Sequence, residues 1–278
     1  MGYLEYNVTI EPFQPETSEA LIALLGDYGF ESFVENETGF QAYIKEDEHK
    51  VSFFEKALSK LITRSEVRYT FKKIKDENWN AVWESNFEPV IIDTRIAVVA
   101  PFHQINPDTK YVIKIEPKMS FGTGHHETTS QVMLMMLEVE MKGATVLDMG
   151  CGTGILAILA HKLGAVDIVG IDNDPQAVEN AIENFERNSC TEIIAITGDT
   201  GAIPSKMFDI ILANINRNTI ADNVGEWMKY LKKGGYIIFS GFYEEDIIFL
   251  KAIFDKLNLS ILKTTTNNKW ACLLCEKH

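Results

Sequence analysis

The segment Val146–Gly154, which reads Val-Leu-Asp-Met-Gly-Cys-Gly-Thr-Gly, constrains the fold of this chain more than any other. Its apolar start predicts a buried strand, and the apolar pattern of Ile155–Leu163 predicts a helix directly after it. A glycine turn between a strand and a helix lets the backbone approach a ligand closely and presents amide groups at the start of the helix. The segment therefore predicts a nucleotide-binding α/β domain.

The spacing of the glycines separates two classes of ligand. A dinucleotide-binding turn needs its third glycine at the position of Ile155, so that motif does not match. The tighter spacing of Gly150, Gly152 and Gly154 suits S-adenosylmethionine, whose amino-acid carboxylate would accept hydrogen bonds from the amides. We therefore predict that Gly150 and Gly152 bind S-adenosylmethionine; the alternative is an incidental glycine turn.

The next predicted strand ends at Asp172, 20 residues after Gly152. At this spacing an acidic side chain reaches the hydroxyl groups of a ribose bound at the glycine turn. We therefore predict that Asp172 binds the cofactor, although a lone aspartate at a strand end is more often a cap or a solvated charge. Asp199 ends the third strand and is a candidate for the adenine edge, with an ordinary polar loop position as the alternative.

Asn214 ends the fourth predicted strand of the domain. Ligands of open α/β sheets bind at the carboxyl ends of the strands, so Asn214 should face the same crevice. Oxygen atoms near this position would hold the hydrogens of an amine and aim its lone pair at the sulfonium methyl group. We predict a catalytic and cofactor-binding role for Asn214; capping of the following helix is the structural alternative.

A glycine-containing segment, Lys118–Ser130, precedes the predicted helix Gln131–Leu137. We expect it to form a mobile loop that closes over the cofactor, with Phe121 excluding water. The loop contains the adjacent residues His125 and His126, which suggest a metal at first sight. Side chains of adjacent residues diverge and no third ligand is apparent, so no metal site is expected.

The hydrophobic periodicity predicts two domains joined by a linker. Over residues 1–75 the order is β-α-β-β-α-β, which is typical of a small α+β ferredoxin-like domain that often serves as a binding module. Residues 76–89 predict a linker helix with Trp79 and Trp83 on one face. Residues 90–278 alternate between strands and helices, which predicts a mostly parallel sheet covered on both faces. The strands are expected at Ile91–Val99, Tyr111–Ile115, Thr145–Met149, Asp167–Asp172, Glu192–Thr197, Phe208–Ala213, Tyr236–Ser240 and Trp270–Cys275.

The net charge of −14 opposes binding to nucleic acid and suits a basic protein partner. No apolar run is long enough to span a bilayer and the first residues lack the features of a signal peptide, so we expect a cytoplasmic enzyme without a membrane segment. The four cysteines are too few and too scattered for a disulfide framework. Cys272 and Cys275 lie in one predicted strand, where an offset of three residues places the two thiols on opposite faces.

Several motifs together resemble one bacterial family, the methyltransferases of ribosomal protein eleven of the large subunit. They are FGTGHHETT at 121–129, LDMGCGTG at 147–154, GIDNDPQAVENA at 170–181 and ANI at 213–215. The tryptophan pair of the linker and the ferredoxin-like front also fit, so the resemblance covers nearly the whole chain. The glycine turn alone is shared by many methyltransferases, whereas FGTGHHETT combined with the front domain is specific.

The resemblance implies an α/β fold, in which a seven-stranded, Rossmann-like, S-adenosylmethionine-dependent methyltransferase domain follows the ferredoxin-like domain. It further implies that the front domain binds the ribosomal protein and that the second domain methylates its lysines, and also its α-amino group. The cofactor contacts of the family carry over to Thr129, Gly150, Asp172 and Asn214. The sequence departs from the family pattern in two places. One is the Glu-Pro-Lys-Met-Ser run that starts at Glu116, and the other is Asn216.

Two other functions remain open on the sequence. The acceptor could be RNA or a small molecule, although the Asn-Ile-Asn-Arg run lacks the Pro-Pro-aromatic pattern of enzymes that methylate base amino groups, and no basic stripe appears. The chain could also be a noncatalytic protein that retains the cofactor pocket, against which the complete set of Gly150, Gly152, Asp172 and Asn214 argues. A catalytic cleft that must admit a protein suggests a monomer.

Overall fold

The computed structural model describes residues 3–50, 52–61, 65–73, 87–105, 107–118 and 121–278. The chain forms two compact units, Met1–Phe87 and Glu88–His278. The linker helix expected at 76–89, with Trp79 and Trp83, lies outside the described residues except for its last three, which are not helical.

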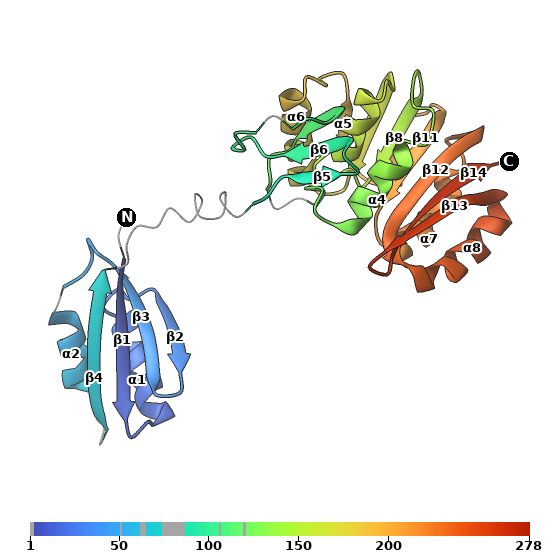
Figure 1. The fold of residues 1–278 in the computed structure, drawn as a ribbon. Helices are drawn as coiled ribbons and strands as arrows, with labels where there is room; N and C mark the ends of the chain where they lie inside the picture. Colours follow the sequence, from blue (N-terminus) through green and yellow to red (C-terminus); the bar gives the residue numbers. More distant parts are fainter. Residues whose placement is uncertain (1–2, 51, 62–64, 74–86, 106, 119–120) are drawn as a thin grey trace. The chain divides into compact units, whose positions relative to one another are not determined.

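The first unit is a four-stranded antiparallel sheet with two helices packed on one face (Figure 1). The strand order is β2-β3-β1-β4. Alternate residues of β1, beginning with Leu4 and Tyr6, are buried beneath the helices, as the two-residue period of a strand requires. The predicted ferredoxin-like fold is therefore confirmed. Its elements are β1 (Tyr3–Glu11), α1 (Pro15–Gly26), β2 (Ser32–Asn36), β3 (Gly39–Lys45), α2 (Ser52–Lys60) and β4 (Glu66–Lys73).

The second unit is built on a seven-stranded sheet with the order β10-β9-β8-β11-β12-β14-β13. The strands from β10 to β12 are parallel, and β14 is antiparallel to both of its neighbours. The chain order reverses between β8 and β11, and such a switch point is where ligands bind in open α/β sheets. The strands are β8 (Thr145–Met149), β9 (Asp167–Asp172), β10 (Ile194–Thr197), β11 (Phe208–Asn214), β12 (Leu231–Tyr243), β13 (Leu259–Asn267) and β14 (Trp270–Lys277).

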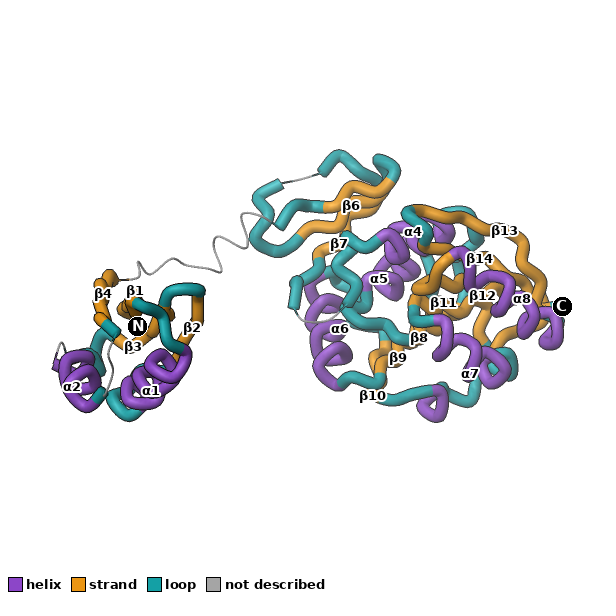
Figure 2. The backbone as a smooth tube through the Cα atoms, turned by 90° about the horizontal axis from the view of Figure 1, so that it is seen from below, coloured by secondary structure: helices purple, strands orange, loops and turns teal. Residues whose placement is uncertain are grey.

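Helices cover both faces of this sheet (Figures 1 and 2). Neighbouring residues of β8 show the division, because Val146 belongs to the core on one face and Leu147 to the core on the other. The first core includes residues of α4, α5 and α6, and the second includes residues of α7 and α8. The predicted seven-stranded methyltransferase fold is thus confirmed. The helices are α4 (Glu127–Met136), α5 (Ile155–Lys162), α6 (Pro175–Arg187), α7 (Arg217–Trp227) and α8 (Ile247–Phe254).

The prediction that Ile91–Val99 is one strand of the main sheet is wrong. The segment forms two short antiparallel strands, β5 (Val90–Ile92) and β6 (Ile96–Val99), because Asp93 and Thr94 adopt positive φ angles and turn the chain. Strand β6 also pairs with β7 (Tyr111–Lys114), so that the three strands form a separate sheet with the order β5-β6-β7.

Strand β13 was absent from the sequence prediction. This strand lies at the edge of the main sheet, and most of its residues are exposed or half-buried. Because an edge strand with little buried surface needs few apolar residues, its threonine-rich sequence lacks the alternation that reveals a strand. The turn that joins it to β14 is made by Asn268 and Lys269, both with positive φ.

Three further observations concern the cysteines, the side chains that could bind a metal, and the lengths of the helices. The thiols of Cys272 and Cys275 are buried in opposite cores, as predicted from their offset in a strand. Within the described ranges, no three His, Cys, Asp or Glu side chains are grouped so that they could share a metal ion. Among the helices described, none is long and apolar enough to cross a membrane.

Candidate active site

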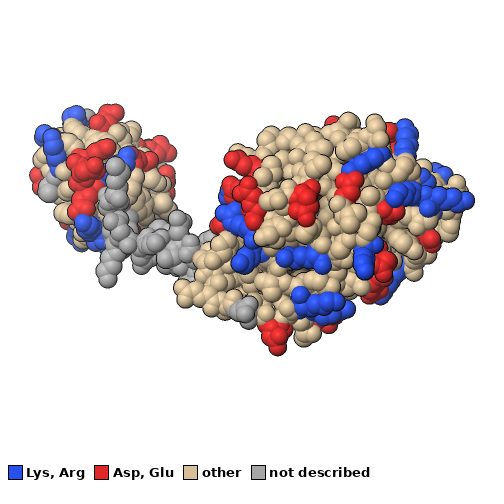
Figure 3. All heavy atoms as spheres, turned by 90° about the horizontal axis from the view of Figure 1, so that it is seen from above, with Lys and Arg blue, Asp and Glu red and all other residues tan. Residues whose placement is uncertain are grey.

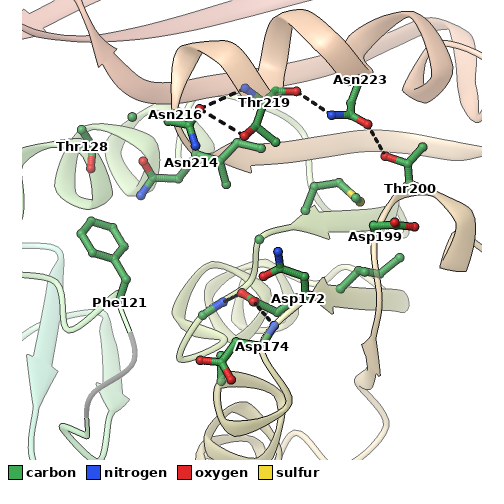
Figure 4. Close-up of a pocket in the computed structure, with 18 of the residues that line it drawn as sticks. Phe121, Thr128, Asp172, Asp174, Asp199, Thr200, Asn214, Asn216, Thr219 and Asn223 are labelled. Carbon is green, nitrogen blue, oxygen red and sulfur yellow. Dashed lines mark hydrogen bonds between the residues drawn. The ribbon is translucent and has the colours of Figure 1, made fainter.

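A pocket of about 560 Å³ lies at the carboxyl ends of β8, β9, β10 and β11 (Figure 4). It occupies the switch point of the sheet, and the residues that follow each of these four strands line it. Thr129 is the one predicted site residue that does not line it. The six that do are Phe121, Gly150, Gly152, Asp172, Asp199 and Asn214.

The glycine turn is held by the strand beside it. The backbone N–H of Gly150 donates to the carbonyl of Ile171 at 2.8 Å, and the N–H of Gly152 donates to Asp172 Oδ2 at 2.8 Å. These two amides are therefore already bonded within the protein, contrary to the expectation that they are free for a ligand carboxylate. Both glycines have positive φ, and a Cβ atom at Gly152 would lie 2.4 Å from the carbonyl oxygen of Phe121.

The carboxylate of Asp172 accepts hydrogen bonds from the glycine turn and from the turn before α6. Its Oδ2 accepts from Gly152 and its Oδ1 accepts from the N–H of Asp174 at 3.0 Å. Asp174 in turn caps helix α6 through Gln176. A carboxylate oxygen accepts more than one hydrogen bond, so Asp172 retains lone pairs for hydroxyl groups in the pocket. The spacing of 20 residues between Gly152 and Asp172 brings the two into direct contact.

Asp148 is a buried carboxyl that the sequence reasoning did not single out. Its side chain is 0% exposed and neither oxygen makes a hydrogen bond among the described residues. Burial, together with the charge of Asp172, raises the pKa of Asp148 to about 7, and the nearby backbone N–H of Ala157 offsets only part of this rise. A charged residue within the apolar run of β8 was the available signal.

Asn214 ends β11 and is held by helix α4. Its Nδ2 donates to Thr129 Oγ1 at 3.2 Å, whereas its Oδ1 is buried with no hydrogen-bond partner among the described residues. Thr129 is 0% exposed and lies behind Asn214, and its neighbour Thr128 lines the pocket instead. The alternative role considered for Asn214, capping of α7, belongs to Asn216, whose Oδ1 accepts from the N–H of Thr219 at 3.0 Å.

The loop that carries Phe121 is bonded to the glycine turn. The N–H of Thr153 donates to the carbonyl of Phe121 at 3.0 Å, and Thr153 Oγ1 contacts the carbonyl of Gly122 at 2.5 Å. The Phe121 ring is 55% exposed at the pocket wall. The two histidines diverge, because His125 contacts the carbonyl of Glu88 and His126 caps helix α4.

The departure from the family pattern before this loop is explained by contacts with α6. Glu116 pairs with Arg187 at 3.2 Å and Lys118 pairs with Glu183 at 2.7 Å. The backbone N–H of Glu116 also donates to Asn184 Oδ1 at 2.8 Å. The unusual residues therefore attach the start of the loop to the helix that follows Asp172.

The far end of the pocket is polar. Asp199 lines it and caps the short 3-10 helix η1 (Thr200–Ala202) by accepting from Gly201 at 2.8 Å. Thr200 bonds Asn223 at 2.9 Å and accepts from the indole of Trp227 at 3.1 Å. The sequence analysis did not predict Thr200 or Asn223 as site residues. Both lie far from the glycine turn along the chain, Thr200 in η1 and Asn223 in α7.

These features fit S-adenosylmethionine. The pocket is lined by a carboxylate at the end of β9, suited to a ribose, and by Asn214 at the end of β11, whose buried amide oxygen has no hydrogen-bond partner among the described residues. Asp199 provides an acceptor for an exocyclic amine at the polar end. An aromatic ring covers the side next to Asn214 (Figure 4).

Comparison with known proteins identifies the family. The family model described as ribosomal protein L11 methyltransferase (PrmA) matches residues 8–278. The chain belongs to the ribosomal protein L11 methyltransferase family. It is 40% identical to the ribosomal protein L11 methyltransferase of Phocaeicola vulgatus over 98% of both chains. It is 42% identical to the protein of that name from Porphyromonas gingivalis, over 92% of this chain and 89% of the relative.

A solved structure agrees with the assignment to the ribosomal protein L11 methyltransferase family. The ribosomal protein L11 methylase of Lactobacillus delbrueckii subsp. bulgaricus superposes with a TM-score of 0.65 at 28% identity. The match covers 69% of this chain and all of that one. Membership in the family confirms that the chain is an S-adenosylmethionine-dependent methyltransferase, as the glycine motif and the resemblance predicted.

Proposed function

We propose that this protein transfers methyl groups from S-adenosylmethionine to lysine ε-amino groups, and to the α-amino group, of ribosomal protein L11. The observation that carries the proposal is the Asn214 amide, which Thr129 holds at the pocket end of β11 and whose oxygen has no hydrogen-bond partner in the described part of the chain. An acceptor amine needs a hydrogen-bond acceptor at this position to orient its lone pair. Membership in the family supports the choice of substrate.

The residues of the chain divide the work of the reaction. Asp172 would bind the ribose hydroxyls, with Gly150 and Gly152 shaping the turn beside it. S-Adenosylmethionine, when bound, supplies an electrophilic methyl group. Asn214 Oδ1 would accept a hydrogen of the incoming amine and fix the direction of its lone pair. Phe121 would exclude water, and no strong base is needed when the amine arrives neutral.

Thr129 takes a different part from the cofactor contact that the resemblance implies. Its hydroxyl touches Asn214 and lies behind the pocket wall, which supports a role in positioning the Asn214 amide. Thr128 is the neighbouring residue whose side chain lies at the pocket, beside Phe121 and Asn214 in Figure 4.

The charge of the chain supports a basic protein substrate. The net charge of −14 favours approach of a basic partner and opposes nucleic acid. On the face drawn in Figure 3, acidic and basic side chains of the described residues are interspersed and no continuous basic stripe is visible. The proposal includes residues 1–75 as the substrate-binding domain, 76–89 as a linker and 90–278 as the catalytic domain of a cytoplasmic monomer.

Incubation with labelled S-adenosylmethionine and total ribosomal proteins tests the function, with mass spectrometry of the labelled band. We expect label on lysines of protein L11 and an Asn214→Ala variant whose kcat falls about 100-fold, the effect of misplacing a reacting group. Asn218→Ala, an exposed asparagine nearby on α7, is the control and should leave kcat unchanged. Label confined to RNA, or cofactor binding without transfer to any ribosomal protein, would contradict the proposal.

A further inference from the structure

Four aromatic side chains form a continuous series at one end of the pocket. The ring of Phe121 lies 5.4 Å from that of His126, and His126 lies 4.8 Å from Trp270 in an edge-to-face arrangement. Trp270 also contacts Tyr243 at 4.2 Å. We call these four residues the aromatic rim. Three of them, Phe121, His126 and Trp270, line the pocket itself.

The rim is a surface and not part of the core. Phe121 and Tyr243 are 55% and 44% exposed, and His126 and Trp270 are half-buried. Large aromatic rings left open at a pocket wall point to a ligand that covers them. Their series extends from the loop before α4 to the last residue of β12 and the first residue of β14, which lie far from that loop in the sequence.

The rim lies at the acceptor end of the pocket. Figure 4 shows Phe121 and Thr128 on the side of Asn214, whereas Asp172 and Asp199 lie toward the other side. The acidic residues suit the sugar and base of the cofactor, so the aromatic end is left for the group that receives the methyl. Trp270 belongs to the same end of the pocket, because its ring contacts His126, whose ring in turn contacts Phe121.

Helix α4 ties the rim to Asn214. Gln131 Nε2 donates to the carbonyl oxygen of Trp270 at 3.1 Å, and Gln131 Oε1 accepts from Thr265 at 3.0 Å. Asn268, in the turn before Trp270, donates to Glu127 at 2.9 Å. The same helix holds Asn214 through Thr129, two residues before Gln131. The backbone of Trp270 and the amide of Asn214 are therefore both hydrogen-bonded to helix α4.

We propose that the aromatic rim binds the side chain of the acceptor lysine, with Trp270 as its main contact. The proposal rests on the proposed function. A lysine offers a hydrocarbon stem that packs on aromatic rings and an ammonium group that their faces attract. The ammonium gives its proton to water before the transfer, so the attacking amine is neutral, and the methylated product carries the positive charge again. Methylated ammonium groups are bound in the same way, so the rim would also retain partly methylated lysine between successive transfers.

Kinetics of Trp270 variants give the first test. Trp270→Leu removes the aromatic face and keeps an apolar side chain, and Trp270→Phe keeps an aromatic ring. We expect Trp270→Leu to raise KM for the protein substrate about ten-fold, which corresponds to ~1.4 kcal/mol, without changing the Kd of S-adenosylmethionine. Trp270→Phe should keep a KM for the protein substrate close to that of the wild type. Phe249→Leu, at a 49% exposed ring of α8 outside the pocket, should behave as wild type.

A binding measurement tests the rim without relying on turnover. Protein labelled with 5-fluorotryptophan gives fluorine resonances, and that of Trp270 is identified by its loss in Trp270→Phe. In the presence of S-adenosylhomocysteine, we expect the amides of Nα-acetyl-lysine and its trimethylated form to shift this resonance saturably. The corresponding norleucine amide, which lacks the ammonium group, should shift it less.

The outcomes separate this inference from the proposed function. A Trp270 resonance that ignores the lysine probes, together with an unchanged KM in Trp270→Leu, would overturn the rim even when ribosomal protein L11 is methylated. Equal loss of cofactor affinity in Trp270→Leu would also overturn it, because Trp270 would then belong to the cofactor site. A resonance that responds to lysine in a protein that labels no ribosomal protein would support the rim and reject the proposed substrate.

Discussion

Asp172 holds two turns beside the pocket and is also the proposed partner of the cofactor ribose. It accepts from the backbone N–H groups of Gly152 and Asp174, and it also lines the pocket. Loss of this carboxylate should free two amides and remove the ribose partner.

We expect Asp172→Ala to weaken binding of S-adenosylmethionine by about 1–3 kcal/mol, the cost of losing a buried hydrogen-bonding partner. Isothermal titration calorimetry of the variant measures this change. Asp255→Ala, at an exposed residue paired with Lys251, is the control and should bind normally. An unchanged Kd in Asp172→Ala would count against ribose recognition.

Asp148 gives the protein a specific dependence on pH. Its pKa rises from 3.8 to about 7 on folding, so the folded protein holds the proton more tightly than the unfolded chain. This contribution to stability is fully present below pH 3.8 and is lost progressively as the pH rises to about 7.

We expect Asp148→Asn, which stays neutral, to be more stable than wild type at pH 7.5, by a difference that shrinks as the pH falls from about 7 toward 3.8. Thermal unfolding of both proteins across that range measures the difference. A constant difference between the two melting temperatures at all pH values would contradict the raised pKa.

The contact between α4 and the hairpin β13–β14 shows how elements remote in sequence build the site. Gln131 is nearly buried and bonds one residue of each strand, Thr265 and Trp270. A second link, the pair of Lys263 in β13 with Glu138, two residues after the end of α4, is half exposed to solvent. The two links therefore offer a matched comparison of a buried and an exposed interaction.

Gln131→Leu should lower the free energy of unfolding by about 1–3 kcal/mol, because it leaves two polar groups without partners. Lys263→Ala should lower it by less than about 1 kcal/mol, since exposed ion pairs contribute little. Denaturation in urea measures both. Equal losses in the two variants would show that the Gln131 bonds are not the stronger link.

At the scale of the whole molecule, the two units are expected to be separable. Residues 88–278 contain the complete pocket and both of its flanking cores. Compact units of this kind generally fold alone.

We expect a fragment of residues 88–278 to bind S-adenosylmethionine with the affinity of the full chain but to methylate ribosomal protein L11 with a much higher KM. Calorimetry and labelling with the full-length protein as control measure the two effects. A fragment with the KM of the full chain would remove the front domain from substrate binding, and the boundaries proposed around residues 75 and 90 would lose their functional meaning.

The fold class, and the meeting of the glycine turn with Asp172, could be predicted from the sequence. Gly150, Gly152 and Asp172 lie within one strand-turn-helix unit and the strand that follows it, and the bonds that join them follow from that unit. The ferredoxin-like front was predictable for a similar reason, since each of its elements has the hydrophobic period of its type.

The contacts around Asn214 and Trp270 depend on tertiary structure. Thr129 and Asn214 are 85 residues apart, and His126 meets Trp270 because helix α4 packs against β14. No local period records such contacts, and β13 carries too little buried surface to be seen as a strand. Sequence therefore fixes features that depend on neighbouring residues, whereas the packing of remote elements decides which side chains share the pocket.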